Sequence, residues 1–134
     1  VENTAGGKNS VARYMDSIER LWEVIGHLNV GLCLDTCHTW AGGIPTIDAV
    51  KGFKKLVKKI DLIHFNDSKD GFESSRDRHE NLGKGKIPKE ELEYVIKNAK
   101  TDIIVETPNG PDAQKKDIAW IRRRLKKWTI YQKT

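Results

Sequence analysis

Two short segments of the sequence pair a carboxylate with an imidazole at close spacing. One is Asp35-Thr36-Cys37-His38, and the other is Asp77-Arg78-His79. In an extended segment, residues two apart point to the same side of the chain, so Asp77 and His79 can bind one ion together. Nitrogen and oxygen ligands of this kind suit a borderline-soft divalent metal. The spacing therefore predicts a metal site built from these segments.

More acids and histidines stand where short, strand-like apolar runs end. With the two segments above they make seven candidate ligands: Glu2, Asp35, His38, His64, Asp77, His79 and Glu106. Each of them alone has an ordinary interpretation, because an acid can cap the next helix and a buried histidine can satisfy a carbonyl. Seven such groups together, without a matching set of bases, would repel one another unless cations lay between them. We therefore expect metal ions here, with Cys37 as a weaker alternative ligand and His27 as a surface or capping residue.

The elements that must position these residues alternate between strands and helices. Apolar runs predict strands at 30–35, 62–66 and 102–106, and residues 1–6 resemble the end of another strand. Such alternation is typical of parallel strands joined by crossover helices, and barrels of this kind carry their catalytic groups at the carboxyl ends of the strands. A complete barrel needs about 250 residues. We therefore predict an α/β fold in which residues 1–134 form a single segment of about four βα units with outer helices, the C-terminal half of a TIM-type (βα)8 barrel whose N-terminal half is absent.

Apolar residues at 3.6-residue spacing predict four helices. Asn9 or Ser10 is expected to cap the first helix and Gly26 to end it, with an inward face of Val11, Tyr14, Met15, Ile18, Leu21, Trp22 and Ile25. The second spans residues 47–60, with an apolar stripe of Ile47, Val50, Phe53, Val57 and Ile60. Pro88 begins the third. Asp112 begins the last, which is expected to turn inward Ile118, Ile121, Leu125 and Trp128.

The net charge of +5 comes from one end of the chain. Residues 122–134 hold six bases and no acid, and the remainder carries 18 bases against 19 acids. Because a helix that follows a barrel strand runs back from the catalytic end, we interpret this basic cluster as a solubilising surface.

No apolar run approaches the roughly 20 residues of a membrane span. Two closely spaced cysteines indicate free thiols in a reducing, intracellular setting, either cytoplasm and nucleoid or nucleus.

Five motifs resemble, in order along the chain, those of the endonuclease IV family. They are Val-Glu-Asn-Thr-Ala-Gly (1–6), Leu-Asp-Thr-Cys-His (34–38), His-Phe-Asn-Asp-Ser-Lys (64–69), Asp-Arg-His-Glu-Asn-Leu-Gly-Lys-Gly (77–85) and Val-Glu-Thr-Pro (105–108). That family consists of zinc-dependent apurinic/apyrimidinic endonucleases with a (βα)8 barrel. The resemblance covers essentially the whole chain but only the C-terminal half of the family's barrel.

The resemblance implies up to three zinc ions, with manganese as an alternative metal. Glu2 resembles a glutamate that bridges two zincs, and Asp35, His64 and Glu106 resemble the other ligands of one of these. His38, Asp77 and His79 resemble the ligands of a third zinc. The remaining ion would take two histidines from the missing half. Glu2, Asp77 and Glu106 are the expected catalytic residues.

The implied activity is hydrolysis of the phosphodiester 5′ to an abasic site, leaving a 3′-OH, in base excision repair of damaged DNA. The implied partners are duplex DNA with abasic sites and either the missing N-terminal half or a second half-barrel chain, with no membrane. Contacts to the DNA backbone are expected from the bases of the long loop, Lys69, Arg76, Arg78, Lys84 and Lys86. The residues that press into the DNA would lie in the missing half.

Two alternatives remain open. A metal-dependent sugar isomerase or epimerase on a similar barrel would use Glu2, Asp35, His64 and Glu106 equally well, but it leaves His38, Asp77 and His79 without a role. A non-catalytic half barrel could instead serve as an interaction module or be an incomplete, inactive half of the enzyme, since parallel strands with open edges need a partner to cover them.

Overall fold

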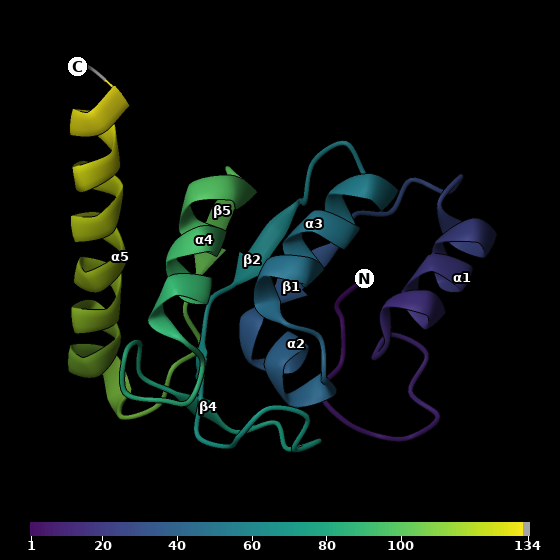
Figure 1. Cartoon of the computed structure of the whole chain (residues 1–134), viewed down its shortest axis with the longest axis horizontal. Coiled ribbons are helices and arrows are strands. Elements are labelled where there is room, and N and C mark those ends of the chain that lie inside the picture. The colour runs from purple at the N-terminus through teal and green to yellow at the C-terminus, as the bar shows by residue number, and fades with distance from the viewer. Residues whose placement is uncertain (133–134) are drawn as a thin grey trace.

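A computed structural model describes the backbone of residues 1–132 and the side chains of residues 1–127. Its helices are α1 Met15–Ile25, α2 Thr36–Gly42, α3 Thr46–Leu56, α4 Lys89–Ala99 and α5 Gly110–Gln132. Its strands are β1 Cys33–Asp35, β2 Leu62–His64, β3 Asp67–Ser68, β4 His79–Glu80 and β5 Asp102–Ile104. Figure 1 shows α1, α3, α4 and α5 ranged along the long axis of the molecule.

The central sheet is parallel and has the order β1-β2-β5. Its register aligns Asp35 with His64 and His64 with Ile104. Glu2 extends the sheet beside β1 through a parallel bridge to Cys33. Four chain segments therefore run side by side in sequence order, each followed by helix, which confirms the predicted part of a TIM-type barrel.

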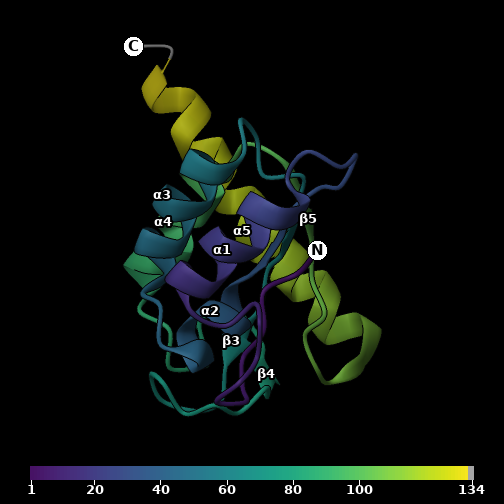
Figure 2. The ribbon, with the colours of Figure 1, turned by 90° about the vertical axis from the view of Figure 1, so that its right-hand side faces the viewer.

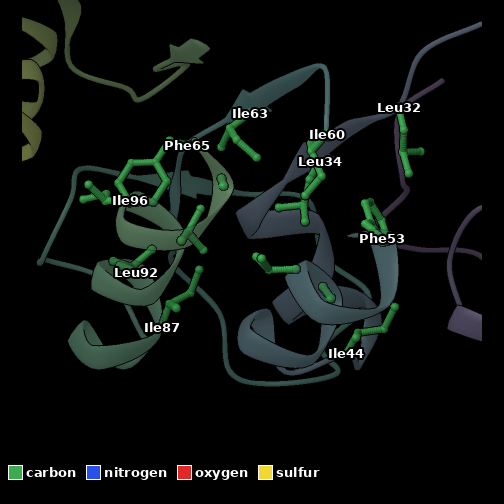
Figure 3. Close-up of a cluster of buried hydrophobic side chains, with 14 of the residues drawn as sticks. Leu32, Leu34, Ile44, Phe53, Ile60, Ile63, Phe65, Ile87, Leu92 and Ile96 are labelled. Carbon is green, nitrogen blue, oxygen red and sulfur yellow. The ribbon is translucent and has the colours of Figure 1, made fainter. Parts of the chain in front are cut away.

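Side chains alternate between the two faces of these strands, and this alternation separates core from site. Leu34 and Ile63 are completely buried in a cluster with Phe53 of α3 and Leu92 of α4. Figures 1 and 2 show α3 and α4 covering one face of the sheet, and Figure 3 shows the side chains packed between. Each large apolar side chain buried there contributes roughly 1.5–3 kcal/mol. The neighbouring residues on each strand, including Asp35, point to the opposite face.

The first helix begins later than predicted. It starts at Met15, its N-cap is Tyr14 without a side-chain cap, and neither Asn9 nor Ser10 caps it, although Gly26 ends it as expected. Residues 8–14 form turns instead, because Ala12 accepts a backbone hydrogen bond from Thr4 N at 2.8 Å. Val11 consequently lies outside the core, 61% exposed, and its predicted inward position is wrong.

The other helices follow the prediction with shifted ends. In α3 the stripe holds at Val50 and Phe53, but the helix stops at Leu56, and Val57 is already extended. Pro88 stands just before α4 as its N-cap residue. A seven-residue helix, α2, directly after β1, and the two-residue antiparallel pair β3–β4 in the long loop had not been predicted.

The last helix, α5, packs on the molecule through fewer residues than predicted. Ile121 is buried, whereas Ile118 and Leu125 are 41% and 42% exposed, so their predicted inward positions are wrong. The side chain of Trp128 and the whole of Lys133 lie outside the described residues.

The basic segment of α5 lies at the end of the molecule opposite β4, where the chain ends in Figure 1. Within it, Arg124 stacks on Trp120, with its guanidinium carbon 3.3 Å from the ring centroid, and donates from Nε to Glu93 at 3.0 Å. This arginine therefore serves packing between α4 and α5. Across the part of the chain that the structure describes, no helix combines the length and the apolar character that a membrane crossing requires.

Candidate metal centre

Four of the seven candidate ligands meet where adjacent parallel segments end. The ligand atoms of Glu2, Asp35, His64 and Glu106 all lie within 4.8 Å of one another, and we call this set the strand-end cluster. His64 is at its centre. Its Nδ1 is 3.1 Å from Glu2 Oε1, 3.2 Å from Glu106 Oε2 and 3.9 Å from Asp35 Oδ2.

The charges in the strand-end cluster are unbalanced. Three carboxylates surround one imidazole, and the side chain of Asp35 is completely buried. Among the described residues, no lysine or arginine forms an ion pair with Glu2, Asp35 or Glu106. Burial raises the pKa of Asp35, although the nearby His38 and His79 oppose the shift. A divalent cation would relieve this repulsion, and one histidine with three carboxylates is a donor set that zinc and manganese accept.

The other three candidate ligands form a second group, His38, Asp77 and His79, which we call the imidazole cluster. The Nε2 atom of His38 lies 3.1 Å from Asp77 Oδ2, and that of His79 lies 3.1 Å from Asp77 Oδ1. Both Nε2 atoms are buried, and neither has a hydrogen-bond partner among the described residues, although an oxygen of Asp77 lies 3.1 Å from each. Buried polar atoms without partners are rare in folded proteins.

The opposite ring nitrogens explain why the Nε2 atoms are free. The Nδ1 atom of His38 is 2.8 Å from the carbonyl oxygen of Asn3, and that of His79 is 3.1 Å from the carbonyl oxygen of Glu106. A carbonyl only accepts, so each Nδ1 carries a proton and donates it, and in the neutral imidazole the lone pair is then on Nε2. This arrangement orients a metal-binding histidine. The residues therefore fit a metal ion.

The two clusters adjoin through Asp35. Its Oδ2 is 3.7 Å from Nε2 of His79 and 4.0 Å from Nε2 of His38. Burial lowers the pKa of His38, but the Asp35 carboxylate, the Asn3 carbonyl and Asp77 outweigh burial, and the net pKa is raised. All seven candidate ligands thus lie around one region at the carboxyl end of the sheet.

Two asparagines that were not among the predicted site residues hold this arrangement in place. Asn66 is completely buried, donates from Nδ2 to Asp35 Oδ2 at 2.9 Å and accepts at Oδ1 from the backbone N–H of Glu106 at 2.8 Å. Asn3 accepts at Oδ1 from the backbone N–H of Asp35 at 2.8 Å. The other oxygen of Asp35 accepts from the backbone N–H of His38 at 2.9 Å, so Asp35 also caps α2.

Both cysteines are free thiols close to the clusters. Cys33 lies within 4.8 Å of Glu2 and His64, and Cys37 lies as close to Asp77 and His79. Burial raises the pKa of Cys33 to about 11 and that of Cys37 to about 12. Since both thiols are neutral at pH 7, the carboxylates and imidazoles beside them are the better ligands. His27 is exposed, as expected of a surface residue.

The five predicted DNA-contacting bases are all exposed in the loop region, but they are not equally free. Arg78 forms a bidentate pair with Asp70, with Nε 2.7 Å from Oδ2 and Nη2 2.5 Å from Oδ1. Arg76 comes within 3.9 Å of the same carboxylate. In the described part of the chain, the side chains of Lys69, Lys84 and Lys86 make no hydrogen bond or ion pair.

A buried carboxylate, Asp67, organises the part of this loop that carries Lys84 and Lys86. Its Oδ2 accepts from the N–H groups of Gly83 and Gly85 at 3.0 Å each, and its Oδ1 accepts from Ile87 at 3.1 Å. A side chain at Gly85 would place Cβ only 2.3 Å from Asp67 Oδ1. Gly85 therefore leaves room for this carboxylate.

Comparisons with known proteins identify the family and support the fold. The sequence matches the model of the xylose isomerase-like TIM barrel family over residues 1–124. It is 47% identical over 125 residues to a protein of Mycobacterium ulcerans named probable endonuclease 4, covering 93% of this chain and 49% of that protein. The chain thus spans about half the length of the curated relatives it matches.

Solved structures also match nearly the whole of this chain with about half of their own length. The crystal structure of endonuclease IV from Thermus thermophilus superposes with a TM-score of 0.77 at 30% identity, covering 95% of this chain and 49% of that one. A D-tagatose 3-epimerase-like protein superposes with a TM-score of 0.67 at 18% identity, over 93% of this chain and 45% of that one. The second likeness concerns the fold alone.

Proposed function

The chain belongs to the xylose isomerase-like TIM barrel family, and we propose that it is the metal-binding part of a DNA repair endonuclease that hydrolyses the phosphodiester 5′ to an abasic site. The observation that carries this proposal is the pair of buried, unpartnered Nε2 atoms beside Asp77, next to the strand-end cluster. The resemblance to endonuclease IV supports it, because the motifs that carry that resemblance contain all seven residues of the two clusters.

Zinc is the proposed metal, with manganese as the alternative. Asp35, His64 and Glu106 would hold one ion together with Glu2, which would also face an ion completed by two histidines outside this chain. His38, Asp77 and His79 would hold a separate ion. Bound zinc lowers the pKa of water from about 15.7 to about 7 and so supplies hydroxide at neutral pH. Three protein ligands leave a fourth position open, as catalytic zinc sites require.

The chain's own residues have distinct parts in this reaction. Hydrolysis adds the oxygen of water to phosphorus and breaks the bond to the 3′ oxygen, which takes up a proton to become the 3′-OH. Asp77, whose side chain is 55% exposed, and Glu106, at 42%, stand at the open side of the site where the phosphodiester would enter. We assign them, with Glu2, to the catalytic groups. Asp35, buried between the two clusters, would hold its ion without touching the DNA.

The exposed loop bases would bind the DNA backbone. Lys69, Lys84 and Lys86 are free to pair with phosphates. Arg78 and Arg76 already lie beside Asp70, so each would divide its interactions between that carboxylate and a phosphate. An abasic nucleotide has lost pairing and stacking, so turning it toward the metals costs less than turning an intact one.

We also propose that residues 1–134 act as one half-barrel segment that the rest of a barrel covers, from the same polypeptide or from a second chain. The sheet ends at the Glu2 segment on one side and at β5 on the other, where Val1 is 46% and Ile104 is 48% exposed. Uncovered parallel edges attract partners. Gel filtration should therefore give a mass above that of one chain, and a well-folded monomer would contradict the proposal.

A metal-dependent sugar epimerase is the second candidate, because the strand-end cluster alone would serve it and an epimerase-like protein shares the fold. The imidazole cluster separates the two proposals. Asp77→Ala removes a member of that cluster only, so an epimerase would keep its metal and its activity.

The decisive experiment measures zinc per chain and nicking of abasic duplex DNA for the wild type, Asp77→Ala and Asp102→Ala. Asp102 is an exposed carboxylate at the start of β5 and is the matched control. We expect Asp77→Ala to lose zinc and to reduce nicking by more than about 100-fold, since changes outside the ligand set already cost 10–100-fold. Absence of bound zinc in the wild type, or equal zinc binding by the two variants, would overturn the proposal, whereas zinc bound without nicking in the wild type would identify the chain as an incomplete half of the enzyme.

A further inference from the structure

The loop that leads to Asp77 presents an aromatic pair. We call residues 69–78, between β3 and β4, the rim loop; Figure 1 shows it running past α2 at the end of the molecule where β4 lies. Phe72 in this loop is 43% exposed and packs edge-on against Trp40 of α2, with ring centroids 5.1 Å apart and an interplanar angle of 69°. Trp40 is itself half-buried, so its ring covers one part of the Phe72 ring while the rest of the Phe72 ring remains open to solvent.

The rim loop is held in one conformation by the carboxyl end of α2. Trp40 donates from Nε1 to the carbonyl of Asp70 at 3.1 Å, and its own carbonyl accepts from the N–H of Glu73 at 2.9 Å. Ser75 N–H donates to the carbonyl of Ala41, also at 2.9 Å. Glu73 and Ser75 adopt left-handed backbone angles, with φ of 60° and 62°. Such conformations cost about 1–3 kcal/mol each in non-glycine residues and are concentrated at functional sites. The exposed ring is thus fixed in place before any ligand arrives.

The rim loop places this ring close to the proposed chemistry. Trp40 is two residues beyond His38, and Phe72 is five residues before Asp77. Five residues span at most about 17 Å, and successive bases of one DNA strand are about 3.4 Å apart along the axis. Phe72 therefore lies within about five nucleotides of a phosphodiester bound at Asp77.

Charge alone does not account for binding of DNA by this loop. Its bases, Lys69, Arg76 and Arg78, are balanced by the acids Asp70, Glu73 and Asp77. Stacking of a base on an aromatic ring does not depend on net charge and contributes to binding of unpaired bases of any sequence.

We propose that Phe72, supported by Trp40, is a stacking platform for a nucleobase within about five nucleotides of the cleaved phosphodiester. This inference rests on the proposed function for its place in the reaction, but the stacking contact itself can be tested without cleavage.

The test compares two fluorescently labelled single strands of equal length, an oligothymidylate and the same sugar-phosphate chain without bases. Their affinities for the full chain are measured by fluorescence anisotropy with wild type, Phe72→Ala, Phe72→Tyr and Val24→Ala. Val24 is an apolar residue of α1 that is 68% exposed and serves as the matched control. Thermal unfolding of each variant verifies folding, and nicking of abasic duplex is measured in parallel.

We expect Phe72→Ala to weaken binding of the oligothymidylate by about 5- to 100-fold, the usual effect of removing one stacked base contact. Its binding of the chain without bases should not change, and Phe72→Tyr and Val24→Ala should bind both strands like the wild type. Equal losses on both strands, or no loss on either, would overturn the platform even if nicking is normal. A base-dependent loss in a wild type that binds no zinc would support the platform and reject the endonuclease.

Discussion

At the scale of single residues, each histidine of the imidazole cluster has its two ring nitrogens assigned to different tasks. Nδ1 donates to a backbone carbonyl, and these carbonyls belong to Asn3, next to Glu2, and to Glu106 itself. The segments that supply strand-end ligands therefore also orient the ligands of the imidazole cluster. A displacement of either segment would disturb both clusters at once, so the groups that hold the ligands should matter here nearly as much as the ligands.

Asn66 tests this coupling between residues. In Asn66→Ala, Asp35 loses a hydrogen bond and the backbone N–H of Glu106 loses its acceptor. We expect affinity for zinc to fall by about 10–100-fold, measured by competition with a chelating indicator. Asn98→Ala is the control, because Asn98 also donates a side-chain hydrogen bond, to Tyr94 O at 2.8 Å, but lies on α4. Equal zinc affinity of the two variants would show that Asn66 does not position the ligands.

At the scale of elements, the sequence allowed prediction of the alternating strands and helices and of the candidate ligands, because polar residues at the ends of apolar runs stand out locally. It gave no sign of α2, since this helix has only seven residues and its cap, Asp35, is also the strand-end acid. Nor could Asn66 be found, because its partner Asp35 is 31 positions away in the sequence. The exposed position of Val11 could not be predicted either, because a hydrogen bond from the backbone N–H of Thr4 to the carbonyl of Ala12 replaces the first helical turn.

Asp67 stabilises the long loop as one unit, and its substitution should cost stability. Both of its oxygens accept two backbone N–H groups, so Asp67→Asn turns an amide NH₂ toward buried donors whichever way it is oriented. We expect a loss of about 2–4 kcal/mol in the free energy of unfolding, measured by urea denaturation. Asp102→Asn, an exposed carboxylate on β5, should change it by less than about 0.5 kcal/mol. A loss for Asp67→Asn as small as that of the control would contradict this role.

Asp70 gives the rim loop a dependence on pH. Hydrogen bonding and ion pairing with Arg78 lower the pKa of Asp70 below its ordinary value. A lowered pKa in the folded state means that the contact stabilises the loop above the unfolded-state pKa of about 3.9 and is lost as pH falls through the folded pKa. The Nε–H resonance of Arg78, followed by NMR on acidification, should therefore move with a midpoint below that value.

Asp70→Asn is the control for this titration, since the amide keeps the shape of the carboxylate but cannot ionise. The resonance of Arg78 should then remain constant over the same range of pH. A midpoint at or above the ordinary pKa of an aspartate in the wild type would show that the pair does not hold the loop.

At the scale of the whole molecule, the fold concentrates negative charge at one end of the sheet. Three carboxylates surround His64, and the paired residues of the sheet fix their positions. Without metal, this arrangement lowers stability through repulsion between like charges. Any ion that binds the folded chain and not the unfolded chain should therefore stabilise the molecule as a whole.

Glu106→Gln tests both effects of this carboxylate, the repulsion in the metal-free protein and the stabilisation by bound metal. At a free zinc concentration 100 times the dissociation constant, the wild type should gain about 2.7 kcal/mol, which corresponds to a rise of about 10 °C in Tm for a domain of this size. A chelator should remove the gain. In Glu106→Gln one of the three carboxylates becomes neutral while its side chain, 42% exposed, stays similar in shape. The metal-free variant should consequently unfold at or above the Tm of the metal-free wild type, yet gain less than half as much from zinc. Calorimetry of both proteins with and without chelator measures all four values. A variant that is less stable without metal and gains as much from zinc as the wild type would show that Glu106 serves the fold rather than the ion.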